Sequence, residues 1–394
     1  MRISKITAVK VIVPIEAPLR HSYGVHEAFA RTLVRVFTDE GLTGLGETSA
    51  RLPTEQVETV GARIVGEDPF DLERIRMKIS HQGYYTRHSL ILGALEMACL
   101  DLQGKAMNLP AFKLLGGAFR NDVPVAGYLF YRYPQADQPG VATSEEMVEH
   151  ARDLVARYGF GTLKLKGGVL RPETEIATVG ALREAFGSTM RLRFDPNGVW
   201  TPETAISAGM RLEAYDLEYY EDPTWGIAGM AAVRRQTRIP IATNMCVVDF
   251  DQFAPAVQAG AVDIILSDLW YWGGLHATKI LARMCQTFGL GIGMHSGIEL
   301  GIGLAAMLHL AVTIPNLTHA IDVHYHHLRD DVISGGLLKC RDGMMRPPEG
   351  PGLGVALDEE RVARYRLRET SHDRGLAAAV DPFRPEWFPT YPSW

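Results

Sequence analysis

The sequence predicts an α/β protein with two parts: a TIM-like parallel β/α barrel and an N-terminal α+β cap. Three observations support this prediction. The chain has 394 residues, which fits one barrel of about 250 residues plus an additional module. From residue 123 onward, short β-rich apolar runs alternate with amphipathic stretches. The later runs start roughly 25 residues apart, the length of one strand-plus-helix unit.

The first 122 residues have the pattern of a mixed α+β module. Residues 3–13 and 32–38 are rich in β-branched residues, and the segment GLTGLGE at 41–47 predicts a turn before another short strand. Residues 89–107 have helical periodicity, with Gly104 near the end. We therefore expect the cap to span residues 1–122.

Eight apolar, β-rich runs predict the barrel strands. They are residues 123–129, 162–166, 190–195, 217–221, 240–243, 262–268, 290–295 and 317–322. Eight parallel strands with intervening helices imply a closed barrel over residues 123–340 rather than an open sheet. A dinucleotide-binding fold has little support, because no G-x-G-x-x-G opens a helix after the first strand. Residues 341–394 are rich in Pro, Gly and aromatic residues, and we expect them to return to the cap.

The composition is that of an ordinary globular protein, with 46% hydrophobic and 22% charged residues. A net charge of −6 gives no electrostatic reason to expect a nucleic-acid or membrane partner. The four cysteines form no C-x-x-C pair, and the N-terminal residues lack the apolar region of a signal peptide. No run of 18 apolar residues occurs. We therefore expect a cytoplasmic protein.

Polar residues cluster at the carboxyl ends of the predicted strands, where barrels carry their sites. In chain order they are Lys164 and Lys166, Asp195 and Asn197, Glu221, Asn244, Asp268, and His295. Each residue alone is equally well explained as a salt bridge or a cap. Six consecutive strands that all end in metal-binding or proton-handling residues are unlikely to arise by chance.

Asp195, Glu221 and Asn244 would supply three oxygen ligands from adjacent strands. Oxygen donors in this number suit a single Mg²⁺ ion per site. Such an ion can stabilise a substrate carboxylate as it becomes an enediolate. The alternative for the segment D-P-N-G, which begins at Asp195, is a simple turn after a strand.

Two pairs of residues are candidates for moving protons. Lys164 and Lys166 lie two apart on one strand and therefore leave the same face, where like charges would lower a lysine pKa. Asp268 and His295 end neighbouring strands, so the carboxylate can hydrogen-bond one imidazole nitrogen and leave the other free. Lys166 and His295 are expected to face opposite sides of a bound substrate.

The segments TLKLK, RFDPNGVW and YYEDP together resemble the enolase superfamily, and specifically its mandelate racemase-like branch. This resemblance runs over nearly the whole chain. It implies a modified barrel of the (β/α)7β type and a capping domain completed by the C-terminal segment. It also implies Mg²⁺ as the cofactor, Asp195 and Glu221 as ligands, and Lys166 as a base.

Within that branch the chain is most similar to the glucarate dehydratase group. ATNM, SDLWYWGG and GMHSG resemble its segments for the third metal ligand, Asn244, and for an Asp–His dyad formed by Asp268 and His295. The resemblance implies that Asn197 contacts the reacting carboxylate. It further implies a mobile, substrate-capping loop near residues 19–28. The implied substrate contacts are His21, His26, Tyr128 and His324.

The chain departs from that group at several positions. His21 stands where Asn is expected and Gly93 where Thr is expected. The C-terminal tail does not align around the Arg that holds the distal carboxylate of glucarate. A substrate with one carboxylate, or a different diacid, is therefore open. His326 and His327 fit a substrate pocket and a surface or subunit contact equally well.

Three functions remain open. The first is a lyase, a Mg²⁺-dependent dehydratase that converts an acid sugar to a 2-keto-3-deoxy acid. The second is a racemase or epimerase of a 2-hydroxy acid that uses the same Lys and His bases. The third is a metal-binding barrel without catalytic activity. Family membership would imply a homo-oligomer, and the expected partner is a small acid-sugar substrate.

Overall fold

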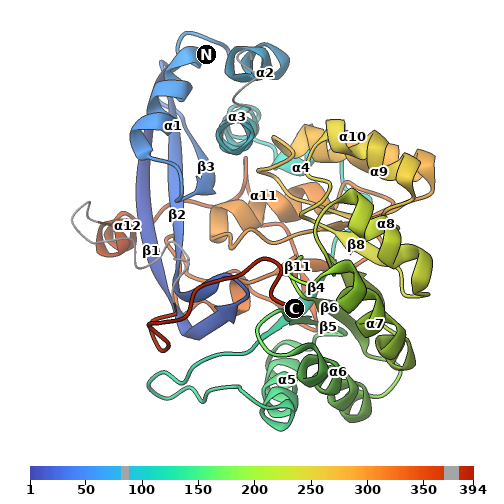
Figure 1. Cartoon of the computed structure of the whole chain (residues 1–394). Coiled ribbons are helices and arrows are strands. Elements are labelled where there is room, and N and C mark those ends of the chain that lie inside the picture. The colour runs from blue at the N-terminus through green and yellow to red at the C-terminus, as the bar shows by residue number, and fades with distance from the viewer. Residues whose placement is uncertain (81–87, 368–380) are drawn as a thin grey trace.

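The computed structural model describes residues 1–80, 88–367 and 381–394. The molecule has two parts, with the antiparallel sheet of the cap on one side and the parallel strands of the barrel on the other (Figure 1). No helix among the described residues is long and apolar enough to cross a membrane.

The cap is an antiparallel sheet in the order β1-β2-β3, with three helices packed near it. Its strands are β1 (Ile3–His21), β2 (Gly24–Thr38) and β3 (Thr43–Ser49), and its helices are α1 (Thr54–Gly61), α2 (Leu72–Ser80) and α3 (Ser89–Met107). The 3₁₀ turn η1 (Ala62–Ile64) follows α1, and α4 (Ala111–Leu114) leads to the barrel. The predicted helix at 89–107 is confirmed, and Asn108 ends it in the left-handed conformation.

The segment predicted as a turn at 41–47 is mostly strand β3. A Cβ atom at Gly44 or Gly46 would lie 2.1 Å and 2.0 Å from the carbonyl oxygens of Ala98 and Ala94. These two glycines therefore allow α3 to approach the sheet closely. The turn itself requires glycine at Gly41, whose φ is +81°.

The barrel contains the eight predicted parallel strands. They are β4 (Val123–Phe130), β5 (Thr162–Lys166), β6 (Arg191–Asp195), β7 (Tyr219–Glu221), β8 (Ile241–Thr243), β9 (Ile264–Ser267), β10 (Gly291–Met294) and β11 (Ile321–Val323). Their order is β10-β9-β8-β7-β6-β5-β4-β11, and a parallel bridge between Ile292 and Leu317 joins the β10 and β11 sides. The predicted barrel is thus confirmed.

Helices fill the first seven intervals between these strands. They are α5 (Ser144–Tyr158), α6 (Pro172–Phe186), α7 (Pro202–Leu212), α8 (Ile227–Gln236), α9 (Phe250–Ala259), α10 (Leu275–Phe288) and α11 (Gly301–Ala311), with the short turn η2 (Glu213–Tyr215) after α7. The last strand is followed by the 3₁₀ turn η3 (Tyr325–His327) instead of a helix. This is the (β/α)7β arrangement.

Helix α11 joins the two parts. All its residues are buried, and it lies between the cap sheet and the barrel (Figure 1). Glu47 on β3 accepts the backbone N–H groups of Leu300 (2.9 Å) and Gly303 (2.9 Å) at the start of this helix. A carboxylate at a helix N-terminus is stabilised by the helix dipole. The cap is therefore held to the barrel by a buried polar contact as well as by apolar packing.

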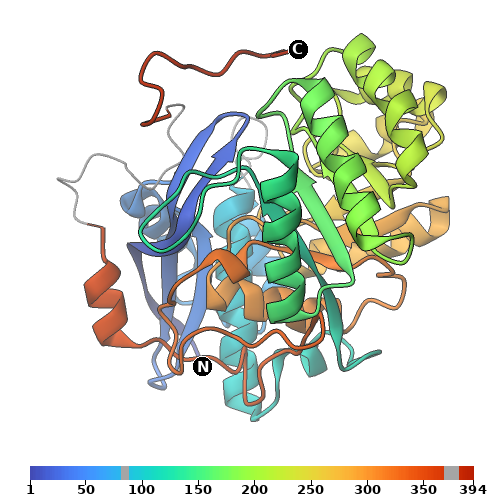
Figure 2. The ribbon, with the colours of Figure 1, turned by 90° about the horizontal axis from the view of Figure 1, so that it is seen from below.

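The C-terminal segment makes contacts on both parts. Strand β12 (Met344–Met345) pairs with β4, and helix α12 (Glu359–Tyr365) leads to an antiparallel bridge between Arg366 and Val11 of the cap. Residues 368–380 lie outside the described part. At the end of the chain, Ser393 N–H donates to Val199 O and Trp394 O accepts from Thr201 N–H, both at 2.7 Å, so the last two residues lie against the barrel. Figure 2 shows this segment running toward the barrel.

Candidate active site

Six consecutive barrel strands carry polar residues at or directly after their carboxyl ends, as the sequence predicts. In order from β5 to β10 these residues are Lys166, Asp195, Glu221, Asn244, Asp268 and His295. Because the strands are parallel, these ends meet at one mouth of the barrel. The structure therefore brings the main predicted site residues to one place.

Two lysines and three carboxylates form a buried ion cluster in the barrel interior. Lys164 Nζ lies 2.7 Å from Asp322 Oδ2 and 3.5 Å from Asp195 Oδ2, and it contacts Glu221. Lys166 Nζ donates to Asp195 Oδ2 at 2.5 Å. Side chains Lys164, Asp195, Glu221 and Asp322 are all 0% exposed, so solvent screens these charges little.

The predicted effect of like charges on the lysines is wrong for Lys164. Burial alone lowers its pKa, but the carboxylates of Asp322 and Glu221 outweigh burial and raise the pKa well above its usual value. Lys164 is thus held as a cation. Burial also raises the pKa of Glu221 well above its usual range. The charge of Lys164 lowers this pKa and that of Asp195 raises it, but the effect of burial is the largest.

Sequence reasoning missed Asp322. This residue lies in β11, and its carboxylate accepts hydrogen bonds from two buried cations. Lys164 Nζ donates to Oδ2, and Arg193 Nη1 donates to Oδ1 at 3.0 Å. Tyr128 O–H donates to Asp322 Oδ2 at 3.3 Å. The signal was present, because an acid inside the apolar run before His324 is expected to be buried and paired.

The three predicted metal ligands lie on adjacent strands and offer oxygen donors. Asp195 and Glu221 are fully buried, and Asn244 is 9% exposed. In the amide orientation that satisfies both its atoms, Asn244 donates to Glu221 Oε1 (3.1 Å) and Asp222 Oδ2 (2.9 Å). In the described part of the chain, no three His, Cys, Asp or Glu residues are arranged to hold a metal ion.

This donor set nevertheless suits a hard cation. Its two carboxylates, Asp195 and Glu221, lie in a buried region where they contact the ammonium groups of Lys166 and Lys164. The raised pKa of Glu221 indicates that more positive charge near its carboxylate would be favourable. The carboxylates of Asp195 and Glu221 match the donors that Mg²⁺ prefers, and Asn244 would join them in its opposite amide orientation, with the oxygen beside Glu221. The residues present therefore fit the predicted ion.

Asp268 and His295 lie together at the ends of β9 and β10, but the predicted hydrogen bond between them is not formed. The distance from Asp268 Oδ2 to His295 Nδ1 is 3.5 Å, and this nitrogen has no hydrogen-bond partner among the residues that the structure describes. Asp268 Oδ1 instead accepts the N–H groups of Trp270 (2.7 Å) and Tyr271 (2.6 Å). On the other side of the ring, His295 Nε2 lies 2.9 Å from the Asn244 amide oxygen.

The segment near residues 19–28 is the end of a paired hairpin, which corrects the prediction of a loop. Leu19 pairs with His26, and His21 pairs with Gly24. The hairpin reaches the barrel site, because Asn197 Nδ2 donates to Ser22 Oγ at 2.9 Å. Ser22 was not among the predicted residues, since its contact joins positions 175 residues apart.

The four predicted substrate contacts form one buried aromatic group beside the ion cluster. His21 and His26 have ring centroids 4.4 Å apart, and Tyr128 stacks on His324 at 4.4 Å. Burial lowers the pKa of His26 to about 3, and it lowers that of His21 and His324 well below the usual range. These rings are therefore neutral, and they offer hydrogen bonds rather than charge.

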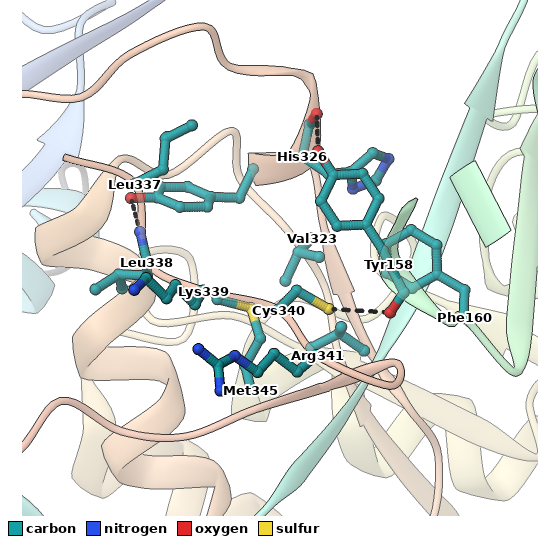
Figure 3. A pocket seen from close by; sticks show the side chains of 12 residues that line it. Tyr158, Phe160, Val323, His326, Leu337, Leu338, Lys339, Cys340, Arg341 and Met345 are labelled. Carbon is teal, nitrogen blue, oxygen red and sulfur yellow. Dashed lines mark hydrogen bonds between the residues drawn. The ribbon is translucent and has the colours of Figure 1, made fainter. Parts of the chain in front are cut away.

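A separate pocket lies behind β4 and β11, where the barrel lacks an eighth helix (Figure 3). Tyr158 of α5 and residues 337–341 form much of its wall. Tyr158 O–H donates to His326 O at 3.5 Å, and Cys340 Sγ lies 3.9 Å from Tyr158 O. Its lining includes none of the predicted catalytic or metal residues, so we do not assign the reaction to it.

Fold and site together define a capped (β/α)7β barrel with a buried cluster of lysines and carboxylates at its mouth. Residues 3–116 match the model for the N-terminal domain of mandelate racemase and muconate lactonizing enzyme. Residues 146–361 match the model described as enolase C-terminal domain-like. The chain belongs to the enolase superfamily, and it is an enzyme of its mandelate racemase and muconate lactonizing branch.

Relatives cover essentially the whole chain. A probable glucarate dehydratase from Streptomyces coelicolor is 41% identical over 99% of this chain and 99% of that protein. An enolase from Mycobacterium smegmatis, solved with tartrate, is 41% identical over 100% of this chain and 98% of that chain, with a TM-score of 0.91. One from Thermobispora bispora, solved with magnesium and formate, is 39% identical over 100% of both chains, with a TM-score of 0.91.

Proposed function

We propose that this chain is a Mg²⁺-dependent dehydratase of an acid sugar, an aldonate or aldarate. It would remove the proton α to the substrate carboxylate and expel the β-hydroxyl group, giving a 2-keto-3-deoxy acid. The observation that carries this proposal is the placement of Lys166 and His295 on well-separated strands, β5 and β10, with the oxygen donors of β6, β7 and β8 between them.

Asp195, Glu221 and Asn244 are the residues that would hold Mg²⁺. The ion would supply positive charge to the substrate carboxylate as negative charge develops there. Asn197 has its amide nitrogen near the same region, and it is positioned by Ser22. A fixed N–H donor of this kind stabilises developing negative charge without reorganisation.

Lys166 or His295 takes the α-proton, and the stereochemistry of the substrate decides which. His295 suits the second step, because its Nε2 lies 2.9 Å from the Asn244 side-chain amide and Asp268 lies near its other nitrogen. From there it delivers a proton to the departing β-hydroxyl, which leaves as water. The resulting enol tautomerises to the ketone. Lys164, fixed as a cation by three carboxylates, offsets part of their negative charge at the base of the site.

Racemisation or epimerisation is the second candidate, and the same pair of proton carriers favours it. Two groups on opposite faces of one carbon can remove a proton from one side and return it to the other. The substrate separates the two functions, because elimination requires a β-hydroxyl.

The test is a screen of C4–C6 sugar acids and diacids with Mg²⁺ in D₂O. A dehydratase forms 2-keto acid, whereas an epimerase gives α-deuterated starting material without keto acid. Chelation of the metal should abolish turnover, and added Mg²⁺ should restore it. If Zn²⁺ restores activity and Mg²⁺ does not, the proposed metal is wrong.

A matched pair of variants tests the metal residues. Glu221→Gln removes a proposed ligand, so its turnover should fall at least about 100-fold. Glu213→Gln changes a carboxylate far from the strand ends that accepts the Arg238 N–H at the surface, and its turnover should stay near that of the wild type. Equal activity of the two variants would contradict the proposed site.

A further inference from the structure

The His run after β11 belongs to a second buried polar cluster, which the proposed reaction does not use. We call it the Arg132 cluster, and its members are Arg132, His150, His326 and His327. Their side chains are 4%, 6%, 6% and 1% exposed. The rings of His326 and His327 lie 4.2 Å apart, and His150 stacks on His327 at 6.5 Å. Arg132 follows β4, His150 lies on α5, and the other two form η3.

Most polar atoms of this cluster have no hydrogen-bond partner in the described part of the chain. They are Arg132 Nε and Nη1, His150 Nε2, His326 Nδ1, and both ring nitrogens of His327. His326 Nε2 lies 3.2 Å from the carbonyl oxygen of Tyr128, so it is the donor there. Buried polar atoms in native proteins are nearly always paired. The cluster therefore has the chemistry of a ligand site.

The charge of Arg132 decides which ligand fits. The nearest acids are Glu16 and Asp153, and each is already paired with Arg157 at 2.9 Å. The imidazoles do not add charge, because burial lowers the pKa of His150 to about 3 and of His326 to about 4. Arg132 is thus a buried cation with free N–H donors, and the neutral rings of His150 and His327 can each offer one more donor, whereas His326 already donates its N–H to Tyr128 O.

We propose that Arg132, His150 and His327 form a buried binding site for a small monoanion, a halide or a carboxylate group. The guanidinium supplies the charge and two N–H donors, and the imidazoles supply the remaining N–H groups. Phe130 lies between this cluster and the proposed active site, because its ring centroid is 5.4 Å from those of both His327 and His324. A free anion and the far carboxylate of a diacid substrate share this chemistry.

The first experiment measures thermal unfolding of the full chain in increasing sodium bromide or sodium formate, with sodium isethionate holding the ionic strength constant. We expect Tm to rise and saturate with either anion, because a ligand that binds only the folded state stabilises it. Arg132→Gln should abolish the saturable rise. Arg152→Gln, which removes a half-exposed cation from the same helix as His150, should keep it.

Wild-type protein that shows no saturable response would overturn the proposal without any variant. A response that Arg132→Gln retains in full would overturn it as well. A crystal grown with bromide should show an anomalous peak within hydrogen-bond distance of Arg132, and peaks elsewhere only would count against the site.

Kinetics then distinguish the two sources of the anion, and this arm alone rests on the proposed function. If the far carboxylate of a diacid occupies the site, bromide should raise KM for diacids and leave KM for monoacids unchanged. If a free anion occupies it, KM should be the same with and without bromide. Either result is consistent with the anion site, which stands or falls on the unfolding experiment.

Discussion

Replacing Asp268 by asparagine removes one charge beside His295 while preserving the local turn. Asp268 Oδ1 accepts the N–H groups of Trp270 and Tyr271, and the amide oxygen of asparagine can accept both. Oδ2 faces His295 Nδ1 at 3.5 Å, and this is the contact that the substitution changes. Asp268→Asn therefore tests the effect of the negative charge near His295 while the hydrogen bonds that hold the local backbone are kept.

The size of the effect follows from that distance. Two unit charges 3.5 Å apart in an effective dielectric of about 20 attract each other by about 5 kcal/mol. This is an upper bound on what Asp268 contributes to a protonated His295 in the transition state, because His295 is 14% exposed and solvent screens part of the field. We expect turnover to fall about 100- to 1000-fold, or about 3–4 kcal/mol.

The assay measures kcat on the substrate found in the screen, with thermal unfolding of the same variant as the control. Tm should remain within a few degrees of the wild-type value, since the two backbone hydrogen bonds are retained. Full turnover would remove Asp268 from the mechanism. A loss of turnover that comes with a large fall in Tm would mean that Asp268 acts through the fold.

Three further predictions concern stability and are measured by urea unfolding. Burial raises the pKa of Glu299 to about 7, so the folded chain holds this proton at pH values where the unfolded chain has lost it. The contribution of Glu299 to stability therefore falls as pH rises from about 4.5 to 7. Glu299→Gln should be more stable than wild type at pH 8 by up to about 3 kcal/mol but not at pH 4. Equal pH dependence of the two proteins would show that the pKa assignment is wrong. Gly46→Ala should lower the free energy of unfolding by about 1–3 kcal/mol or more, because its Cβ would meet a helix carbonyl. Gly161→Ala, with open space around the Cβ, should change it by no more than about 0.5 kcal/mol. Similar values for the two variants would contradict the close packing of α3. Lys164→Met removes the cation that pairs with three buried carboxylates, so it should lower the free energy of unfolding by about 3–5 kcal/mol. An unchanged urea midpoint would mean that the ion cluster does not stabilise the fold.

The barrel could be predicted from the sequence because its signal is local. Strands buried on both faces are short apolar runs, and each run ends in a polar residue at the barrel mouth. Glycine was harder to interpret. The sequence does not distinguish a glycine in a turn from a glycine that lets a helix pack closely on a strand. Gly44 and Gly46 were therefore assigned to a turn, although of these three glycines only Gly41 has the positive φ of a turn.

The candidate site was predictable in its members but not in its electrostatics. The positions of Asp195, Glu221 and His295 follow from strand ends alone. The charge state of Lys164 depends on Asp322, which is 158 residues away in the chain. Counting only the like charge of Lys166 therefore gave the wrong direction for its pKa. Contacts across such separations have no local signal in a single sequence.

The contacts between cap and barrel indicate how the two parts divide the work. The hairpin that carries His21 and His26 is fixed to the barrel, because Arg20 N–H donates to Tyr131 O at 2.9 Å and Ser22 accepts from Asn197. The proposed proton carriers stand on barrel strands, and the neutral rings of the hairpin face the same space. Substitutions at His21 or His26 can therefore change which acid fits without moving Lys166 or His295. Under the proposed function, the barrel supplies the proton carriers together with Tyr128 and His324, and the cap adds His21 and His26 to the substrate contacts.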